Sequence, residues 1–124
     1  MSNPNTLNVA IIGCGGIATG KHLPALSKQS KAVLVAFCDL VESRAQEAAD
    51  QYGAEGAKVY TDYNELLQDS NIEVVHVCTP NDSHAAITIA ALEAGKHVLC
   101  EKPMAKTTEE ARSMIEAAER TGKK

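Results

Sequence analysis

Short apolar runs alternate with amphipathic stretches along the whole chain. The runs have the length of strands, and residues 9–12 are apolar throughout, as in a strand that is buried on both faces. Between the runs, small and apolar residues recur at helical spacing, as Ala45, Ala48 and Tyr52 do. Strands that alternate with helices are typical of βαβ units, which predict a parallel sheet with right-handed crossovers. The predicted strands are residues 9–12, 32–38, 58–60, 74–78 and 97–100.

One helix is predicted after each of these strands. The first is expected to be kinked near Pro24, because proline removes a backbone donor inside a helix. Asp62 and Thr107 each precede a glutamate by three residues, which is the pattern of a capping box at the start of a helix. The last helix is expected to bury one apolar stripe, formed by Ala111, Met114, Ile115 and Ala118. The predicted helices span about residues 16–29, 41–52, 62–68, 83–93 and 107–121.

The first predicted strand runs directly into the pattern Gly13-x-Gly15-x-x-Ala18. This is the dinucleotide-binding fingerprint in its expected place, after a strand and at the start of a helix. Gly13 permits a tight turn, Gly15 lets a pyrophosphate approach the backbone, and Ala18 lets the helix lie close to the strand. Gly16 and Ile17 belong to the same turn, where the positive end of the helix faces the phosphates. We therefore expect an α/β domain with a Rossmann-type doubly wound parallel sheet and the strand order 3-2-1-4-5.

The glycine-rich turn has two other interpretations. It could be a connection without a ligand, since three small residues recur by chance. Residues 15–21 also match most of a P-loop, whose last position must be Ser or Thr to bind magnesium. His22 occupies that position and is a poor magnesium ligand, and the strand ends at Gly13 rather than at Gly15. The P-loop is therefore rejected.

An acidic residue, Asp39, ends the second apolar run about 20 residues after the fingerprint. A carboxylate at this strand tip accepts hydrogen bonds from the ribose hydroxyls in the adenosine half of a dinucleotide. Its charge repels a 2′-phosphate, so NAD is favoured over NADP as the cofactor. Arg44 leaves an alternative, because it is either a ligand of that phosphate or a solvated helix residue. Asp39 could instead only cap the helix that begins near Val41.

Ligands of open α/β sheets bind beyond the carboxyl ends of the strands, where the strand order reverses. On the half of the sheet expected to hold the nicotinamide, these ends carry Glu101 and Lys102. Glu101 can accept a hydrogen bond from a ribose, and Lys102 either places a cation near a substrate hydroxyl or is a solvated loop lysine. His84 is expected to start a helix, while His76 and His97 are expected to be structural. The fourth strand is followed by Thr79, Pro80, Asn81 and Ser83.

Four segments of the chain resemble the amino-terminal domain of the glucose–fructose oxidoreductase/inositol dehydrogenase (Gfo/Idh/MocA) family. They are, in order, GCGGIATGKHLPAL, CD, CTPNDSH and CEKPMAKT. The resemblance covers nearly the whole chain, and the tripeptide Glu101-Lys102-Pro103 is its most specific feature. Members of this family are NAD(P)-dependent oxidoreductases that mostly act on sugar or cyclitol hydroxyls. The resemblance further implies a cis bond between Lys102 and Pro103.

The resemblance also implies a role for each part of the site. Asp39 binds the adenosine ribose, Glu101 is directed to the nicotinamide ribose, and Lys102 is the catalytic-site lysine that assists proton transfer. The pyrophosphate turn is formed by Gly13, Gly15 and Ala18. The cofactor is further lined by Thr79, Pro80, Asn81 and His84. Family members are much longer, because a second α/β domain supplies most substrate contacts and usually the acid/base residue; these 124 residues do not contain it.

The composition limits the number of domains, the class of partner and the cellular location that we expect. A length of 124 residues provides one domain with a core, and a formal charge of −4 argues against nucleic acid as a partner. Residues 1–6 are polar, and the apolar run after them is too short for a signal peptide or a membrane span, so we expect a cytoplasmic protein. Four cysteines, expected near one another at strand ends, have no metal-ligand or disulfide spacing. We expect them to be reduced, although a metal site there is conceivable. The cysteines are Cys14, Cys38, Cys78 and Cys100.

Three classes of function remain open. The first is the cofactor half of a sugar-type dehydrogenase. The second is a free-standing dinucleotide-binding or sensor module that works with a partner chain. The third and least favoured is a structural domain with an unused site. Without the second domain and a sixth strand, it is expected to bind the cofactor with little or no turnover. Apolar surface left beside the fifth strand and the last helix, including Met114 and Ile115, is expected to cause self-association.

Overall fold

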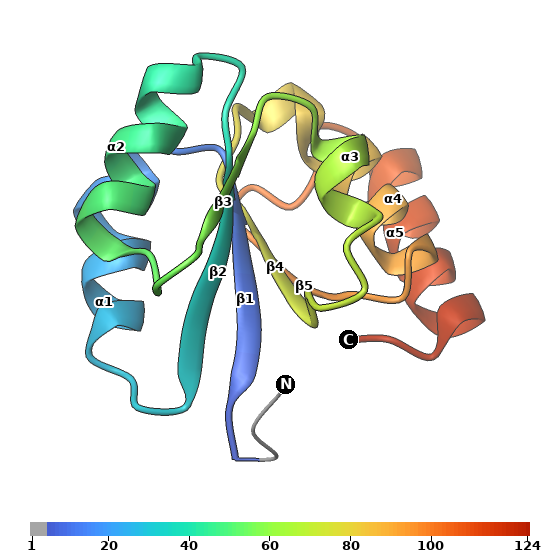
Figure 1. Ribbon diagram of the computed structural model, residues 1–124. Helices are drawn as coiled ribbons and strands as arrows, with labels where there is room; N and C mark the ends of the chain where they lie inside the picture. The colour runs from blue at the N-terminus through green and yellow to red at the C-terminus, as the bar shows by residue number, and fades with distance from the viewer. Residues whose placement is uncertain (1–4) are drawn as a thin grey trace.

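A five-stranded parallel sheet lies between two layers of helices in the computed structural model, which describes residues 5–124 (Figure 1). The strand order is β3-β2-β1-β4-β5, which confirms the predicted topology. The first four residues of the polar amino terminus lie outside the described residues. The strands are β1 (Leu7–Ile12), β2 (Ala32–Cys38), β3 (Lys58–Tyr60), β4 (Val74–Val77) and β5 (His97–Cys100).

Each crossover between strands contains a helix, as the alternating pattern predicts. Figure 1 shows α1 and α2 on one face of the sheet and α3, α4 and α5 on the other. A π-helical turn (Ala18–His22) precedes α1, and a 3-10 turn (Asn81–Ser83) precedes α4. The α-helices are α1 (Leu23–Ser27), α2 (Glu42–Tyr52), α3 (Tyr63–Leu67), α4 (His84–Glu93) and α5 (Thr108–Thr121).

The central strand β1 is buried on both faces, as its continuous apolar run predicts. Ala10 and Ile12 belong to the cluster of buried side chains that includes residues of α3 and α4. Val9 and Ile11 belong to the cluster on the opposite face, with residues of α1 and α2. Successive side chains of a strand point to opposite faces, so one apolar run contributes to both cores. This fixes β1 in the middle of the sheet, with the glycine turn at its carboxyl end.

The first predicted helix forms over residues 16–27, but its middle is a π-helical turn. In this turn, the Leu23 N–H donates to the carbonyl of Ala18, five residues back. Pro24 lies in the first turn of α1 and has no N–H of its own, so the irregularity precedes it in the chain. The predicted kink near Pro24 is therefore present as a wider turn over Ala18–His22.

Two predicted helix caps form with altered partners. The Asp62 side chain accepts a hydrogen bond from the Asn64 N–H rather than from Glu65. Thr107 accepts from the Glu110 N–H at 3.1 Å, as in a capping box, but Glu110 accepts in return from the N–H of Lys106 at 3.1 Å. Both side chains still satisfy amides that lack partners in the first helical turn, so the predicted helix starts are correct.

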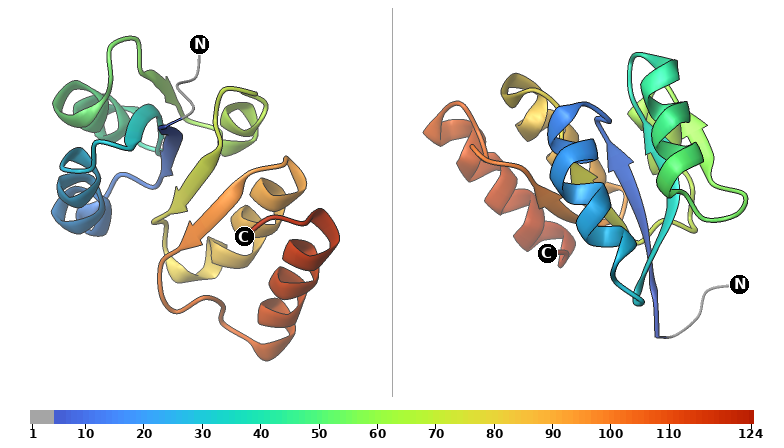
Figure 2. Two further views of the ribbon diagram at one scale, coloured as in Figure 1. Left: turned by 90° about the horizontal axis from the view of Figure 1, so that it is seen from below. Right: turned by 90° about the vertical axis from the view of Figure 1, so that its left-hand side faces the viewer.

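The buried stripe of α5 differs from the predicted one. Met114 is 4 % exposed and Ala117 is fully buried, whereas Ile115 is 51 % exposed. The helix packs beside α4, so only the face that carries Met114 and Ala117 reaches the core (Figure 2). The predicted buried stripe is therefore correct for Met114 and wrong for Ile115, whereas the predicted exposed patch is correct for Ile115 and wrong for Met114.

The end of the chain lies against the edge strand β5. The Val98 N–H donates to the carbonyl of Lys124 at 2.7 Å, and the Lys124 N–H donates to Nδ1 of His97 at 3.1 Å. The strand edge expected to be unpaired is therefore partly occupied, although Leu99 on β5 is 48 % exposed. Within residues 5–124, no helix is long and apolar enough to cross a membrane.

Candidate functional site

The glycine turn begins where β1 ends between β2 and β4. The Gly13 N–H donates to the carbonyl of Cys38 on β2, and Gly13 adopts a φ of +94°. A Cβ at this position would lie 2.7 Å from the carbonyl carbon of Cys78 and 2.8 Å from the Thr79 nitrogen. Both the left-handed backbone and the close approach of the segment after β4 require glycine here.

The rest of the turn is open. A Cβ on Gly15 or Gly16 would meet no atom within 4 Å, and the helix starts at Gly16. The first amides of a helix have no carbonyl of a preceding turn to bond, so they are available to a ligand. Ala18, by contrast, is completely buried against the sheet. The turn therefore has the open backbone and the close helix contact that a pyrophosphate site requires.

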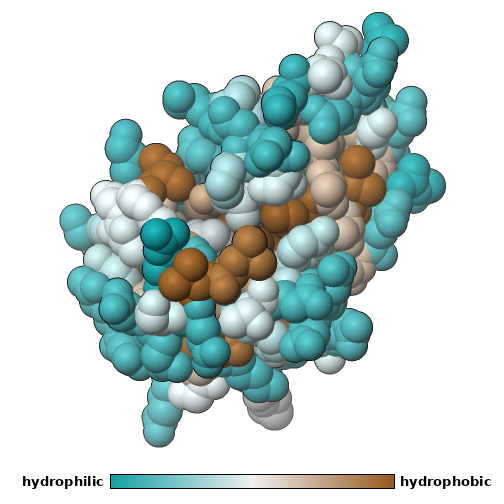
Figure 3. Space-filling view, turned by 90° about the horizontal axis from the view of Figure 1, so that it is seen from above, coloured by the Kyte–Doolittle hydropathy of each residue, from teal (hydrophilic) through white to brown (hydrophobic). Residues whose placement is uncertain are grey.

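A cavity of about 810 Å³ lies beside this turn at the carboxyl edge of the sheet. Figure 3 looks down on this edge, where apolar side chains reach the surface across the middle of the face and hydrophilic ones surround them. Gly13, Gly15 and Asp39 line one part of the cavity, and Thr79 and Pro80 line another. Its size is in the range of cofactor and ligand sites. Thr61, Asp62 and Tyr63 also line the cavity but were not predicted as site residues, since Asp62 was predicted only as a helix cap.

Asp39 both lines the cavity and organises its wall. Its Oδ2 accepts a hydrogen bond from the Cys14 N–H in the glycine turn, and its Oδ1 accepts from the Val41 N–H, each at 2.8 Å. The two interpretations of Asp39 are therefore compatible, because it holds the turn before α2 and also faces the ligand space. A carboxylate has about four acceptor positions, so lone pairs are left for ribose hydroxyls.

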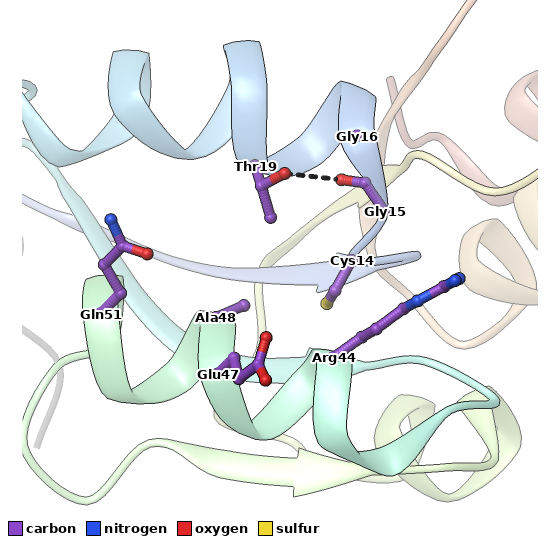
Figure 4. A pocket seen from close by; sticks show the side chains of 8 residues that line it. All are labelled: Cys14, Gly15, Gly16, Thr19, Arg44, Glu47, Ala48 and Gln51. Carbon is purple, nitrogen blue, oxygen red and sulfur yellow. Dashed lines mark hydrogen bonds between the residues drawn. The ribbon is translucent and has the colours of Figure 1, made fainter.

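Arg44 borders two hollows. It lines the 810 Å³ cavity and also a second hollow of about 470 Å³ between α2 and the first helix. Figure 4 shows this second hollow, with Arg44 and Glu47 on α2 and with Thr19 on the opposite helix donating to the Gly15 carbonyl at 3.0 Å. No ion pair involves Arg44 in the described part of the chain. Both of its predicted roles, as a phosphate ligand or as a solvated helix residue, stay open.

The segment after β4 is tied to the segment after β5 by His84. Its ring is fully buried, with Nδ1 at 2.7 Å from the Pro103 carbonyl oxygen and Nε2 at 2.8 Å from the Thr79 carbonyl oxygen. A neutral imidazole donates to only one of these acceptors, and only the imidazolium form donates to both. His84 starts α4 as predicted, but it is not among the residues that line the cavity, and Asn81 is exposed. That these two residues line the bound cofactor stays a prediction.

A hydrogen-bonded trio, Glu101, His22 and His76, lies at the other half of the edge. His22 Nε2 is 2.6 Å from Glu101 Oε2, and His22 Nδ1 is 2.9 Å from His76 Nδ1. Burial lowers the pKa of His76 to about 4, with a smaller contribution from His22. The hydrogen bonds from His22 and then from the Lys102 N–H hold the pKa of Glu101 below its ordinary value.

The contacts of His22 with Glu101 and His76 were not predicted from the sequence. From the sequence, His22 was interpreted only as a poor magnesium ligand and His76 only as a structural residue. Their contact joins positions 54 residues apart, and the Glu101 contact joins positions 79 apart. No local pattern predicts such a pairing, because it depends on the π-helical turn that ends at His22.

Lys102 is exposed next to this trio. Its N–H donates to Glu101 Oε1 at 3.1 Å, and the bond between Lys102 and Pro103 is cis, which confirms that prediction. The Nζ of Lys102 forms no ion pair within residues 5–124. The structure thus brings Lys102 to the same edge as the glycine turn, while its predicted catalytic role stays a prediction.

The four cysteines are free thiols at or near the strand ends. Burial is the main cause that raises the pKa of Cys14, Cys38 and Cys78 to about 12, and the pKa of Cys100 is raised as well. Thiols with such pKa values stay protonated at neutral pH and are poor metal ligands. The described residues contain no cluster of His, Cys, Asp or Glu that could hold a metal ion.

The chain matches the family model described as "Oxidoreductase family, NAD-binding Rossmann fold" over residues 7–124. Among curated proteins, it is 43% identical over 120 residues to inositol 2-dehydrogenase of Salmonella typhimurium. That alignment covers 96% of this chain and 35% of the relative. The chain therefore spans about a third of the length of the curated relatives it matches.

Two solved structures have the same fold and contain nicotinamide cofactors. KijD10, a 3-ketoreductase from Actinomadura kijaniata solved with NADP, superposes with a TM-score of 0.89 at 31% identity, covering 96% of this chain and 36% of KijD10. The WlbA dehydrogenase from Chromobacterium violaceum, solved with NADH and UDP-GlcNAcA, gives a TM-score of 0.89 at 31% identity. This alignment covers 98% of this chain and 34% of WlbA.

Proposed function

Because the chain belongs to the Gfo/Idh/MocA oxidoreductase family, we propose that it is the cofactor domain of a sugar or cyclitol dehydrogenase. Its NAD-binding Rossmann fold is shown by the match over residues 7–124 and by the strand order. The observation that carries the proposal is the arrangement of the open glycine turn and Asp39 along one cavity. The named relatives, which include an inositol 2-dehydrogenase and a dehydrogenase solved with a sugar nucleotide, support the substrate class.

Each part of the edge has a proposed role. The amides of Gly15 and Gly16 bind the pyrophosphate, and the free lone pairs of Asp39 accept from the adenosine ribose. Thr79, Pro80 and Glu101 face the nicotinamide half. Bound NAD supplies the hydride acceptor.

Lys102 is proposed to bind the substrate rather than to stabilise the fold. Its exposed ammonium can donate to a substrate hydroxyl and hold it towards the nicotinamide half of the site. The expectations that these 124 residues bind the cofactor with little turnover, and that the protein is cytoplasmic, stay predictions.

Replacing Asp39 with Ala or Ser is expected to narrow the preference for NAD over NADP. In the unmodified chain, the carboxylate attracts the ribose hydroxyls and repels a 2′-phosphate, so NAD(H) should bind more tightly than NADP(H). Removing the charge should reduce the ratio of the two affinities roughly tenfold. Isothermal titration with all four dinucleotides measures this ratio.

Glu47→Ala is the matched control for charge. It removes an acid from α2 near the second hollow but leaves the ribose acceptor in place, so it should not change the NAD/NADP ratio. Thermal unfolding of the Asp39 variants checks that the turn held by Cys14 and Val41 survives. Equal affinities for NAD and NADP in the unmodified chain would contradict the role of Asp39, and absence of all binding would contradict the proposed function.

Self-association is proposed through exposed apolar side chains of β5 and α5. Leu99 and Ile115 are about half exposed, whereas Met114 is buried and does not contribute. Ile115→Lys and Leu99→Lys are therefore expected to shift light scattering towards the monomer. Leu7→Lys, a change at another exposed leucine at the amino end of the sheet, is the control. A monomeric unmodified chain at high concentration would contradict this proposal.

A further inference from the structure

The trio of Glu101, His22 and His76 is connected by two short contacts and joins three elements of the fold. Glu101 follows β5, His22 ends the π-helical turn, and His76 lies in β4. The contacts of 2.6 Å and 2.9 Å are within hydrogen-bond range, and the two rings meet edge to face at an interplanar angle of 87°. The side chains of His22 and Glu101 are 11% and 23% exposed, so water screens them only in part.

The protons of this trio can be counted from its contacts. A carboxylate only accepts, so His22 Nε2 must carry a proton that it donates to Glu101. The contact between the two Nδ1 atoms holds one further proton, which belongs either to His76 or to His22. If it belongs to His76, both rings are neutral and the trio carries a net charge of −1. If it belongs to His22, that ring is an imidazolium and His76 is neutral with its proton on Nε2.

These two states differ by one proton. Uptake of a proton at Nε2 of His76, with transfer of the Nδ1 proton to His22, converts the first state into the second and brings the net charge to zero. Of the two rings, His22 contacts the Glu101 carboxylate, whereas burial disfavours a charge on His76 and lowers its pKa to about 4, so we place the added positive charge on His22. The added charge therefore lies directly beside the carboxylate of Glu101.

Few other titratable groups act on the trio. Glu101 faces the cation of Lys102 and the thiols of Cys78 and Cys100, whose raised pKa values keep them neutral near pH 7. In the sheet, His76 lies between Ile11 of β1 and Leu99 of β5, which carry no charge. Lys21 precedes His22 on the same turn and is exposed. His84 is a further histidine at this edge, because its Nδ1 lies 2.7 Å from the Pro103 carbonyl oxygen. The His22→Gln variant separates the contribution of His84 from that of the His22–His76 pair.

We propose that Glu101, His22 and His76 form a proton-linked relay that sets the charge of the nicotinamide end of the site and thereby its preference between oxidised and reduced cofactor. The inference rests on the proposed function, which directs Glu101 to the nicotinamide half. The nicotinamide ring is positive in NAD⁺ and neutral in NADH. A trio with a charge of −1 attracts the positive ring, whereas a trio without net charge does not. His22 is in this sense a positioning residue that acts through Glu101.

The test measures the dissociation constants of NAD⁺ and NADH between pH 5.5 and 8.5. The ratio Kd(NADH)/Kd(NAD⁺) is expected to rise about fivefold across this range, because deprotonation restores the negative charge of the trio. Groups that face the adenosine half act on both forms equally, so they cancel in the ratio. A ratio that does not change with pH in the unmodified chain would overturn the relay.

Three variants locate the titrating group. His22→Gln keeps an N–H donor for Glu101 but cannot titrate, so the pH dependence of the ratio should disappear. His76→Phe retains a ring in the sheet but removes the Nδ1 partner, so the pH midpoint of the ratio should shift. His97→Gln replaces a histidine of β5 outside the trio and should leave the pH dependence unchanged. Loss of the pH dependence in His97→Gln but not in His22→Gln would overturn the assignment.

A second measurement needs neither variants nor cofactor. Imidazole ¹⁵N chemical shifts of the unmodified chain should show His76 protonated on Nδ1 at high pH and on Nε2 at low pH, as His22 gains its second proton. Unchanged tautomers of both rings from pH 5.5 to 8.5 would overturn the relay even if His22→Gln does not fold. Absence of binding by NAD⁺ and NADH at every pH overturns the proposed function together with the relay, whereas tight binding with a constant ratio overturns the relay alone.

Discussion

Gly13→Ala is expected to lower the free energy of unfolding by about 4 kcal/mol. Two costs add at this position. The φ of +94° disfavours any residue with a Cβ, and the new Cβ would lie 2.7–2.8 Å from backbone atoms of Cys78 and Thr79. The backbone that follows β4 cannot move away as a flexible side chain could, because the Cys78 N–H donates to the Ile12 carbonyl at 2.8 Å. Such a loss is a large part of the stability of an ordinary domain.

Two other glycines separate these costs. Gly95 has a φ of +84°, but a Cβ there would meet no atom within 4 Å, so Gly95→Ala has the backbone cost without the clash. Gly15→Ala should have neither cost. Denaturant unfolding, followed by circular dichroism, measures all three variants. The explanation fails if Gly13→Ala is no more destabilising than Gly95→Ala.

The topology was predictable because the apolar runs and the residues at the helix ends indicate the same arrangement of strands and helices. The run at residues 9–12 is apolar at every position, which is typical of a strand covered on both faces, and β1 is that central strand. Gly53 follows α2, and Thr107 and Gly122 flank α5, so the ends of both helices lie within about two residues of the predicted ones.

Side-chain exposure was less predictable, because it depends on which neighbour a helix meets. The sequence of α5 offers apolar residues over a wide arc, and Met114 and Ile115 are adjacent in it. The packing of α5 beside α4 selects Met114 and Ala117 and leaves Ile115 in solvent. Periodicity alone indicates that a buried face exists, but it does not fix the rotation of the helix within that arc.

At the carboxyl edge of the sheet, the positions of the residues were also more predictable than the contacts of their side chains. Gly13, Asp39 and Lys102 lie at this edge because the carboxyl ends of parallel strands meet there, and this follows from sequence order. The contact of His22 with Glu101 depends on side chains brought together across three elements. His84 shows the same limit, since its position at the start of α4 was predicted but its bonds to Thr79 and Pro103 were not.

Gly15→Ala is expected to abolish most of the cofactor affinity while leaving the fold intact. The unliganded chain has room for the methyl group, since no atom lies within 4 Å of the added Cβ and Gly15 does not have a positive φ. The proposed pyrophosphate site, however, needs that space for its close approach to the backbone. Loss of one hydrogen bond from an amide to a charged oxygen weakens binding by on the order of a hundredfold.

Gly20→Ala is the matched control for this prediction. It introduces the same methyl group one helical turn further along, at an exposed position where a Cβ also meets no atom within 4 Å. Alanine favours helix over glycine by about 1 kcal/mol, so this variant should be as stable as the unmodified chain or slightly more stable, with unchanged affinity for NAD. Isothermal titration and thermal unfolding of both variants provide the comparison. If Gly15→Ala binds NAD as tightly as Gly20→Ala, the pyrophosphate does not approach the chain at Gly15. The glycine turn would then serve only the contact between β1 and the first helix.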